Sequence, residues 1–173
     1  INDNSNIEQG NVGKYFTAID KIDHKGQFDY YLENASSTDK SMKMVASKNG
    51  NSPQWKTAAF VSKQAYRYGT YEFTYRLSAN DIYLWPMIWT LPDDESGTNK
   101  IARPEFDLLE AWGSYTGNNH VISTHVYTGN NQPKMFQKQV KVDLTKQHTI
   151  KLDWQRDKVE YYLDGTKQLT VTE

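Results

Sequence analysis

Three carboxylates lie within six residues of the segment RPEFDLLEAWG, as Glu105, Asp107 and Glu110. Helical geometry would place residues two and five positions apart on different faces. A regular strand puts Glu105 and Asp107 on one face but turns Glu110 to the other. A β-bulge near Leu108 and Leu109 would reset the alternation and return Glu110 to the shared face. We therefore predict a bulged strand that carries one acidic site.

The chemistry of such a site is that of a retaining glycosidase. Two inward-leaning glutamates on this strand can bring their carboxyl groups to about 5–5.5 Å, where one attacks the anomeric carbon and the other protonates the leaving oxygen. Crowded carboxylates repel one another, so one of them keeps its proton near neutral pH, as a general acid requires. The alternative is a solvated acidic edge strand. The interleaved Phe106, Leu108 and Leu109 disfavour it, because they need a core on the opposite face.

The segments that must position this strand also show strand patterns. Apolar and polar residues alternate in YEFTYRL (71–77) and in HTIKLDW (148–154), while NHVISTHVYTG is rich in β-branched and aromatic residues. Asp164-Gly165 separates two strand-like runs, which is a strong hairpin signal. No segment shows a sustained apolar period of 3.6 residues. The sequence therefore predicts an all-β fold, specifically an antiparallel β-sandwich.

Composition excludes several other classes of protein. The 173 residues provide about one domain with a single core, and 12 Tyr and 5 Trp argue against disorder. A formal net charge of -1 offers no basic field for nucleic acid. The absence of cysteine excludes disulfides, thiolate metal sites and cysteine nucleophiles. No apolar run is long enough to span a membrane, so neither nucleic acid nor membrane is an expected partner.

The spacing Glu-x-Asp-x-x-Glu resembles the bulged active-site strand of family 16 glycoside hydrolases, which include laminarinases, agarases and carrageenases. Upstream, YRYGTYEFTYRLSANDIYLWPMIWTLP is similar to the family's Tyr-Gly-x-Tyr-Glu and Trp-Pro-x-x-Trp-x-Leu-Pro segments. Downstream, HTIKLDWQRDKVEYYLDG resembles its Trp and Tyr-x-Asp-Gly hairpin. The three motifs occur in family order. The resemblance implies a concanavalin-like jelly roll, one catalytic domain over 1–173, and retaining endo-hydrolysis of a β-linked polysaccharide.

The resemblance also implies roles for individual acids. By position, Glu105 resembles the nucleophile, Glu110 the acid/base, and Asp107 the assisting carboxylate between them. His125, in STHVYTG, resembles a family histidine on the neighbouring strand, although a structural role is equally open for a lone strand histidine.

Aromatic residues near the acids are the expected substrate platforms. Trp85 and Trp89 match two family tryptophans that stack on sugar rings; we expect Trp85 to face the ligand and the other to pack in the core. Trp112 follows Glu110 by two residues, so it can serve as a sugar platform or pack at the rim of the cleft. Arg67 can reach the cleft edge, with a plain surface role as its alternative.

The last residue, Glu173, comes soon after the C-terminal hairpin, where family members usually continue with further strands. We therefore expect a truncated chain, a reduced variant, or strands supplied by a second fragment or partner chain. No cofactor is expected to be required and no metal ligand is assigned. Family members often bind a structural Ca²⁺ on the convex face, but the sequence maps no residue to such a site.

The favoured function is a secreted, extracellular endo-β-glycosidase. β-1,3-glucan is the first choice of substrate, and a β-galactan such as agar or carrageenan is the second. Sulfated galactans would favour basic cleft residues, for which Lys100 and Arg103 are weak candidates. The alternative is a non-catalytic carbohydrate-binding module or lectin on the same fold. Three clustered carboxylates favour the enzyme, because a lectin needs the aromatic residues but has no use for the acids.

Overall fold

The computed structural model describes residues 12–19, 28–38, 41–48, 50, 55–79, 85–91, 104–111, 119–127 and 133–172. Strands dominate this part of the chain, so the predicted all-β class is confirmed. No helix among these residues is long and apolar enough to cross a membrane. The chain forms two compact units, Ile1–Tyr66 and Arg67–Glu173. One catalytic domain over 1–173 stays a prediction.

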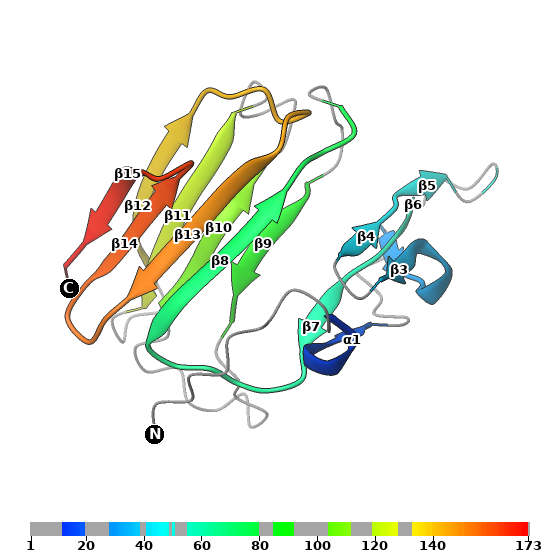
Figure 1. Ribbon diagram of the computed structural model, residues 1–173, viewed down its shortest axis with the longest axis horizontal. Helices are drawn as coiled ribbons and strands as arrows, with labels where there is room; N and C mark the ends of the chain where they lie inside the picture. The colour runs from blue at the N-terminus through cyan, green and yellow to red at the C-terminus, as the bar shows by residue number, and fades with distance from the viewer. Residues whose placement is uncertain are drawn as a thin grey trace. The chain divides into compact units, whose positions relative to one another are not determined.

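The first unit consists of short elements (Figure 1). A helical turn, α1 (Val12–Tyr15), precedes β1 (Phe16–Ala18), which pairs antiparallel with β7 (Phe60–Ser62). The remaining pairs are β2 (Phe28–Tyr30) parallel to β6 (Trp55–Thr57), β5 (Ser47–Lys48) antiparallel to β6, and β3 (Ala35–Ser37) antiparallel to β4 (Met42–Met44). A 3-10 turn, η1 (Leu32–Asn34), joins β2 to β3. Its buried Asn34 donates from Nδ2 to Val45 O at 2.9 Å, which ties the turn to the chain after β4.

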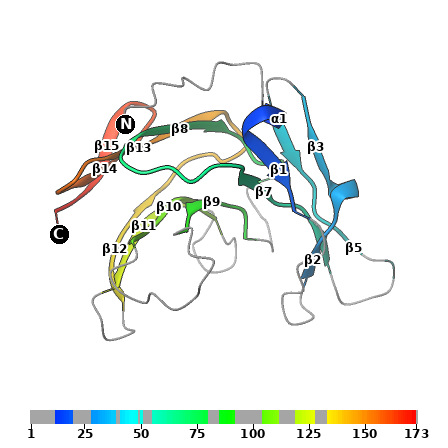
Figure 2. The same cartoon turned by 90° about the horizontal axis from the view of Figure 1, so that it is seen from below.

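The second unit is an antiparallel sandwich of two four-stranded sheets. Figures 1 and 2 show the two sheets as separate layers. One sheet has the order β12-β11-β10-β9 and consists of β9 (Met87–Thr90), β10 (Pro104–Glu110), β11 (His120–Tyr127) and β12 (Pro133–Val140). The other has the order β15-β14-β13-β8 and consists of β8 (Gly69–Tyr75), β13 (His148–Trp154), β14 (Val159–Leu163) and β15 (Thr166–Val171).

The predicted C-terminal hairpin is confirmed. Asp164 and Gly165 join β14 to β15 with φ values of 50° and 78°. Positive φ at both central residues is the requirement of the tight turn that matches the twist of a hairpin.

The core of the sandwich joins residues from both sheets. Its buried members are Phe106, Leu108, Ile122, Ile150, Leu152, Val159, Tyr161 and Leu163. Tyr161 also makes a polar link across the core, because its hydroxyl donates to Ser123 O at 3.0 Å and lies 2.6 Å from Thr124 Oγ1. Since the tyrosine hydrogen serves the carbonyl, Thr124 donates to the tyrosine oxygen. This link attaches β14 directly to the strand beside β10.

We expect Tyr161→Phe to lower the free energy of unfolding by about 1–3 kcal/mol, because it leaves a buried carbonyl and a buried hydroxyl without that partner. Urea denaturation measures the change. The matched control is Tyr162→Phe on the same strand, whose hydroxyl donates to Glu160 Oε2 at 3.0 Å in a partly buried contact. Equal losses in the two variants would show that the polar link across the core adds no more stability than the Tyr162 hydrogen bond.

Candidate active site

The strand β10 has the bulge that the acid spacing predicts. Its register against β11 is regular up to Asp107, which lies opposite Ser123, and shifts before Glu110. Its register against β9 shifts between Asp107 and Leu109. Two adjacent leucines, Leu108 and Leu109, are both buried in the core at this point. The bulge therefore sends two successive apolar side chains inward and returns Glu110 to the face of the other two acids.

The three carboxylates share one cavity, so the prediction of a single acidic face is confirmed. The cavity has a volume of about 340 Å³ and lies on the face of the β9–β12 sheet that is turned away from the core. Its described lining consists of Trp85, Met87, Trp89, Glu105, Asp107, Glu110, His125, Met135 and Gln137. Aromatic, thioether and amide side chains thus surround the acids on strands β9, β11 and β12.

A buried histidine supports the bulge from the core side. His120 Nε2 lies 2.6 Å from Leu108 O, and its Nδ1 is bonded to the hydroxyl of Tyr75. A carbonyl can only accept, so Nε2 carries the hydrogen and Nδ1 accepts from the tyrosine. Burial lowers the pKa of His120 to about 4, which keeps the ring neutral. No spacing in the sequence marked His120, because its role depends on the carbonyl that lies across the sheet.

Asp107 is the most enclosed of the three acids. Its Oδ2 lies 2.8 Å from Ser123 Oγ and 3.1 Å from His125 Nε2. Its Oδ1 is buried without a hydrogen-bond partner among the described residues. Burial raises the pKa of Asp107 to about 7; the charges of Glu110 and Glu105 act in the same direction, and the Ser123 hydrogen bond opposes them. The site therefore holds a carboxyl that keeps its proton almost to neutral pH.

Glu110 is held from two directions. Trp85 Nε1 donates to Oε1 at 3.2 Å, and Ser123 Oγ lies 2.6 Å from Oε2. Sequence reasoning missed Ser123. The one available signal was its position two residues before His125, which places both on the same face of a strand. These contacts fix the orientation of the carboxyl group that the resemblance assigns as acid/base.

Both predicted tryptophans line the cavity, with exposed fractions of 51% for Trp85 and 44% for Trp89. The expectation that one of them packs in the core is wrong. Trp89 lies opposite Asp107 in the register, and cross-strand partners share a face of the sheet. Trp85 precedes β9, so strand alternation does not govern its direction.

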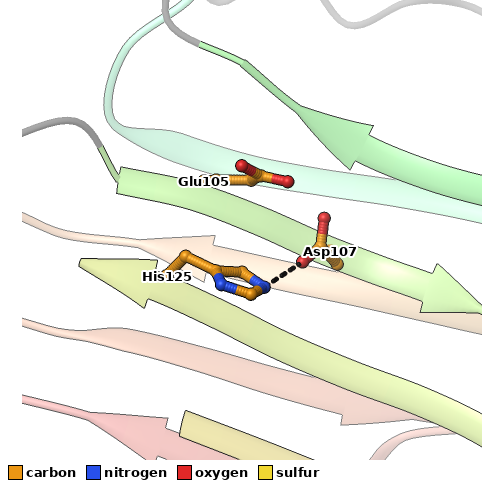
Figure 3. A group of neighbouring side chains, drawn as sticks. All are labelled: Glu105, Asp107 and His125. Carbon is orange, nitrogen blue, oxygen red and sulfur yellow. Dashed lines mark ion pairs between the residues drawn. The ribbon is translucent and has the colours of Figure 1, made fainter. Parts of the chain in front are cut away.

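Of the other predicted binding residues, one lines the cavity, one lies elsewhere on the surface, and the rest are outside the described residues. His125 lines the cavity beside Asp107, and Figure 3 shows their ion pair with Glu105 nearby on β10. Arg67 is exposed and lies over the Tyr68 ring, and it is not among the described residues that line the cavity. Trp112 lies outside the described residues, as do Lys100 and Arg103. Met87, Met135 and Gln137 line the cavity although the sequence did not single them out.

Two of the acids and the neighbouring histidine are close enough together to contact one cation. One ligand atom each from Glu105, Asp107 and His125 lies within 4.8 Å of the others (Figure 3). The contact between His125 and Asp107 accounts for part of this clustering without a metal. The absence of a cofactor requirement stays a prediction.

The family model of glycosyl hydrolases family 16 matches residues 24–173. The chain belongs to this family. Membership supports glycosidase activity as the general class of function.

Solved structures show the same fold. A family 16 endo-glucanase from Bacteroides ovatus matches with a TM-score of 0.73 and 18% identity, over 92% of this chain and 73% of its own. A laminarinase from Flavobacterium sp. UMI-01 matches with a TM-score of 0.72 and 19% identity, over 93% and 73%. β-Agarase B from Zobellia galactanivorans matches with a TM-score of 0.68 and 21% identity, over 92% and 59%. The predicted jelly roll is confirmed.

One relative is named for binding a glucan instead of hydrolysing it. The chain is 31% identical over 122 residues to a β-1,3-glucan-binding protein of Penaeus monodon. The match covers 64% of this chain and 33% of the relative, so the chain spans about a third of that protein.

Proposed function

We propose that this protein hydrolyses a β-linked polysaccharide within the chain and with retention of anomeric configuration. The observation that carries the proposal is the bulged strand, which places Glu105, Asp107 and Glu110 in one cavity. Retaining glycosidases need two carboxyl groups on opposite sides of the scissile bond, one as nucleophile and one as acid/base. Strand β10 meets this requirement, because Glu105 and Glu110 are the first and last of the three acids that it places in the cavity.

In the first step, Glu105 attacks the anomeric carbon while Glu110 donates its proton to the departing glycosidic oxygen. In the second step, Glu110 takes a proton from water, and the water oxygen displaces Glu105 from the anomeric carbon. Asp107 lies between them and contacts His125 at 3.1 Å. Because the pKa of Asp107 is raised to about 7, part of this carboxyl is still protonated at neutral pH. Asp107 therefore adds less negative charge beside Glu105, which makes ionisation of the Glu105 nucleophile easier.

The lining of the cavity supports a neutral sugar chain as substrate. Trp85 and Trp89 offer exposed indole faces, and aromatic faces bind the apolar C–H faces of sugar rings. No lysine or arginine occurs among the nine lining residues that the structure describes, whereas three are acids. Sulfate groups would be repelled in such a site. This favours β-1,3-glucan first and an unsulfated β-galactan second; Trp112 remains a candidate platform.

The alternative is binding of a β-glycan without hydrolysis. The similarity to the glucan-binding protein of Penaeus monodon favours it, because that relative is named for binding. Release of reducing ends from a panel of β-1,3-glucan, mixed-linkage glucan, agar and carrageenan separates the two functions. Binding to a polysaccharide without release of reducing ends would establish the binder. We further propose that the protein acts outside the cell and without a cofactor, so dialysis against EDTA should leave its activity unchanged.

The stereochemical outcome is a separate test. We expect the first product of hydrolysis to have the β configuration at its new reducing end, because two successive displacements restore the starting anomer. Proton NMR during the first minutes of reaction, before mutarotation, measures it. An initial α product would mean that water attacks directly and that Glu105 is not the nucleophile.

A further inference from the structure

The bulge in β10 has a polar support on its core side. Within the described strands, Asp107 and Leu109 have register partners on β9, but Leu108 between them has none, and it has none on β11 either. A bulge leaves its extra residue out of the ladder, so the carbonyl of that residue needs a partner from elsewhere. His120 is that partner, because its Nε2 donates to Leu108 O at 2.6 Å. The bulge therefore depends on a side chain of the neighbouring strand.

This histidine is itself fixed by the other sheet. Its Nδ1 accepts from the hydroxyl of Tyr75 on β8, and the two rings meet edge to face with centroids 5.5 Å apart. An acceptor at Nδ1 requires the ring hydrogen to be on Nε2, so Tyr75 selects the tautomer that donates to Leu108. His120 is fully buried, and Tyr75 packs against the buried cluster that contains Leu108 and a second one that contains Leu109. Two hydrogen bonds in series thus tie the bulge to the opposite sheet.

The bulge determines where Glu110 lies relative to Glu105. Glu105 precedes the register shift and pairs regularly with β11, whereas Glu110 follows the shift. The contacts of Glu110 with Trp85 and Ser123 orient its carboxyl group, but the bulge sets the position of its backbone along the strand. A displacement of the Leu108 carbonyl therefore changes the separation of the two glutamates.

We propose that His120 is a positioning residue that holds Glu110, through the Leu108 carbonyl, where it can protonate the leaving glycosidic oxygen. The inference rests on the proposed glycosidase function. His120 is fully buried and is not among the described residues that line the cavity, so it acts only through the backbone of β10. A misplacement of about 1 Å in a catalytic group can lower a rate by about 100-fold. Tyr75 contributes one bond further away, because it fixes the histidine tautomer.

The alternative is that His120 only stabilises the core, as a buried polar residue with two partners does. The same core offers a comparison, because Tyr161 also links the two sheets, through Ser123 O and Thr124 Oγ1. These two residues of β11 lie where the pairing with β10 is still regular. Loss of either link should lower stability, but only loss of the His120 link should move Glu110.

The test compares His120→Leu with His120→Gln. Leucine removes the donor, whereas the glutamine amide places an N–H near the position of Nε2 and can still donate to Leu108 O. We expect kcat/KM for polysaccharide to fall by about 100-fold in His120→Leu and to be largely restored in His120→Gln. An aryl glycoside with a good leaving group needs little acid assistance, so its kcat/KM should fall by less than about tenfold. Tyr161→Phe should leave the ratio of the two rates unchanged.

A second readout is independent of activity. Crystal structures of the variants should show the Glu110 carboxyl displaced from Glu105 by about 1 Å in His120→Leu and unmoved in His120→Gln. Thermal melting checks that both fold; if His120→Leu does not, Tyr75→Phe replaces it and should show the same preferential loss on polysaccharide, smaller in size. An unmoved Glu110, or equal losses on both substrates, would overturn the positioning role. If the unmodified protein cleaves no β-glycan, the proposed function fails, but the crystal structures still decide whether His120 holds Glu110 in place.

Discussion

Replacement of Glu105 or Glu110 by glutamine is expected to remove nearly all hydrolysis while the fold and polysaccharide binding remain. Glutamine matches the size of glutamate but can neither attack the anomeric carbon nor donate a carboxyl proton. Loss of general acid catalysis alone lowers rates by about 10²–10⁴-fold. Glu105→Gln should lose at least as much, because no covalent intermediate can form. Single-turnover assays with polysaccharide and binding measurements on the same variants give both quantities.

Azide distinguishes the two glutamates. With an activated aryl glycoside, Glu105→Ala should yield an α-glycosyl azide, because azide replaces the missing nucleophile. Glu110→Ala should yield a β-glycosyl azide, because azide attacks the covalent intermediate in place of water. The control is Glu72→Gln, which changes an exposed glutamate on β8 in the other sheet and should keep full activity. Exchanged anomers would mean that the roles of Glu105 and Glu110 are reversed.

The second large effect is on the pH dependence of stability. The pKa of Asp107 rises from 3.8 to about 7 in the folded protein. Between these values the folded state keeps a proton that the unfolded chain has lost, so this group lowers stability as pH rises through the window. Asp107→Asn cannot titrate. Its stability relative to the unmodified protein should therefore increase with pH, by up to roughly 4 kcal/mol between about pH 4 and pH 7.

His120 acts in the opposite direction. Its pKa falls from 6.5 to about 4 on folding, so the protein loses stability as pH decreases through that window. In the unmodified protein the two slopes oppose each other, and the profile should be shallow. Asp107→Asn removes one of them and should show a steep loss of stability in acid. Urea denaturation across this pH range measures both profiles, with Asp157→Asn in an exposed turn as control. Parallel profiles for Asp107→Asn and the unmodified protein would contradict the assignment.

The bulge could be predicted because the residue types of this strand show which positions face the site and which face the core. Acids at 105, 107 and 110 alternate with apolar residues at 106, 108 and 109, and only one extra residue in the strand reconciles the two sets. The hairpin at Asp164-Gly165 could also be predicted, because its turn requires positive φ at both central residues and few residue types adopt that conformation. In both cases the information is local, within one strand or one turn.

Other parts of the site depend on what lies across the sheet. Ser123 matters because the register of β10 and β11 places it opposite Asp107, and strand alternation alone does not specify the register between strands. His120 matters because the bulge turns the Leu108 carbonyl toward it. Trp85 lines the cavity, as the family resemblance led us to expect, but the direction of Trp89 follows from its partner in the next strand. Long-range pairing is therefore the information that the sequence lacked.

The bulge also limits how this strand can change length in evolution. Deletion of either Leu108 or Leu109 would give Glu-Phe-Asp-Leu-Glu, a strictly alternating strand with its acids still on one face. The acids would keep their shared face, but the core would lose a fully buried leucine, at a cost of about 2–5 kcal/mol. Deletion of both would turn the last acid into the core. The extra residue thus serves the packing beneath the site more than the alignment of the acids, and a relative that lacks it must fill the space from another strand.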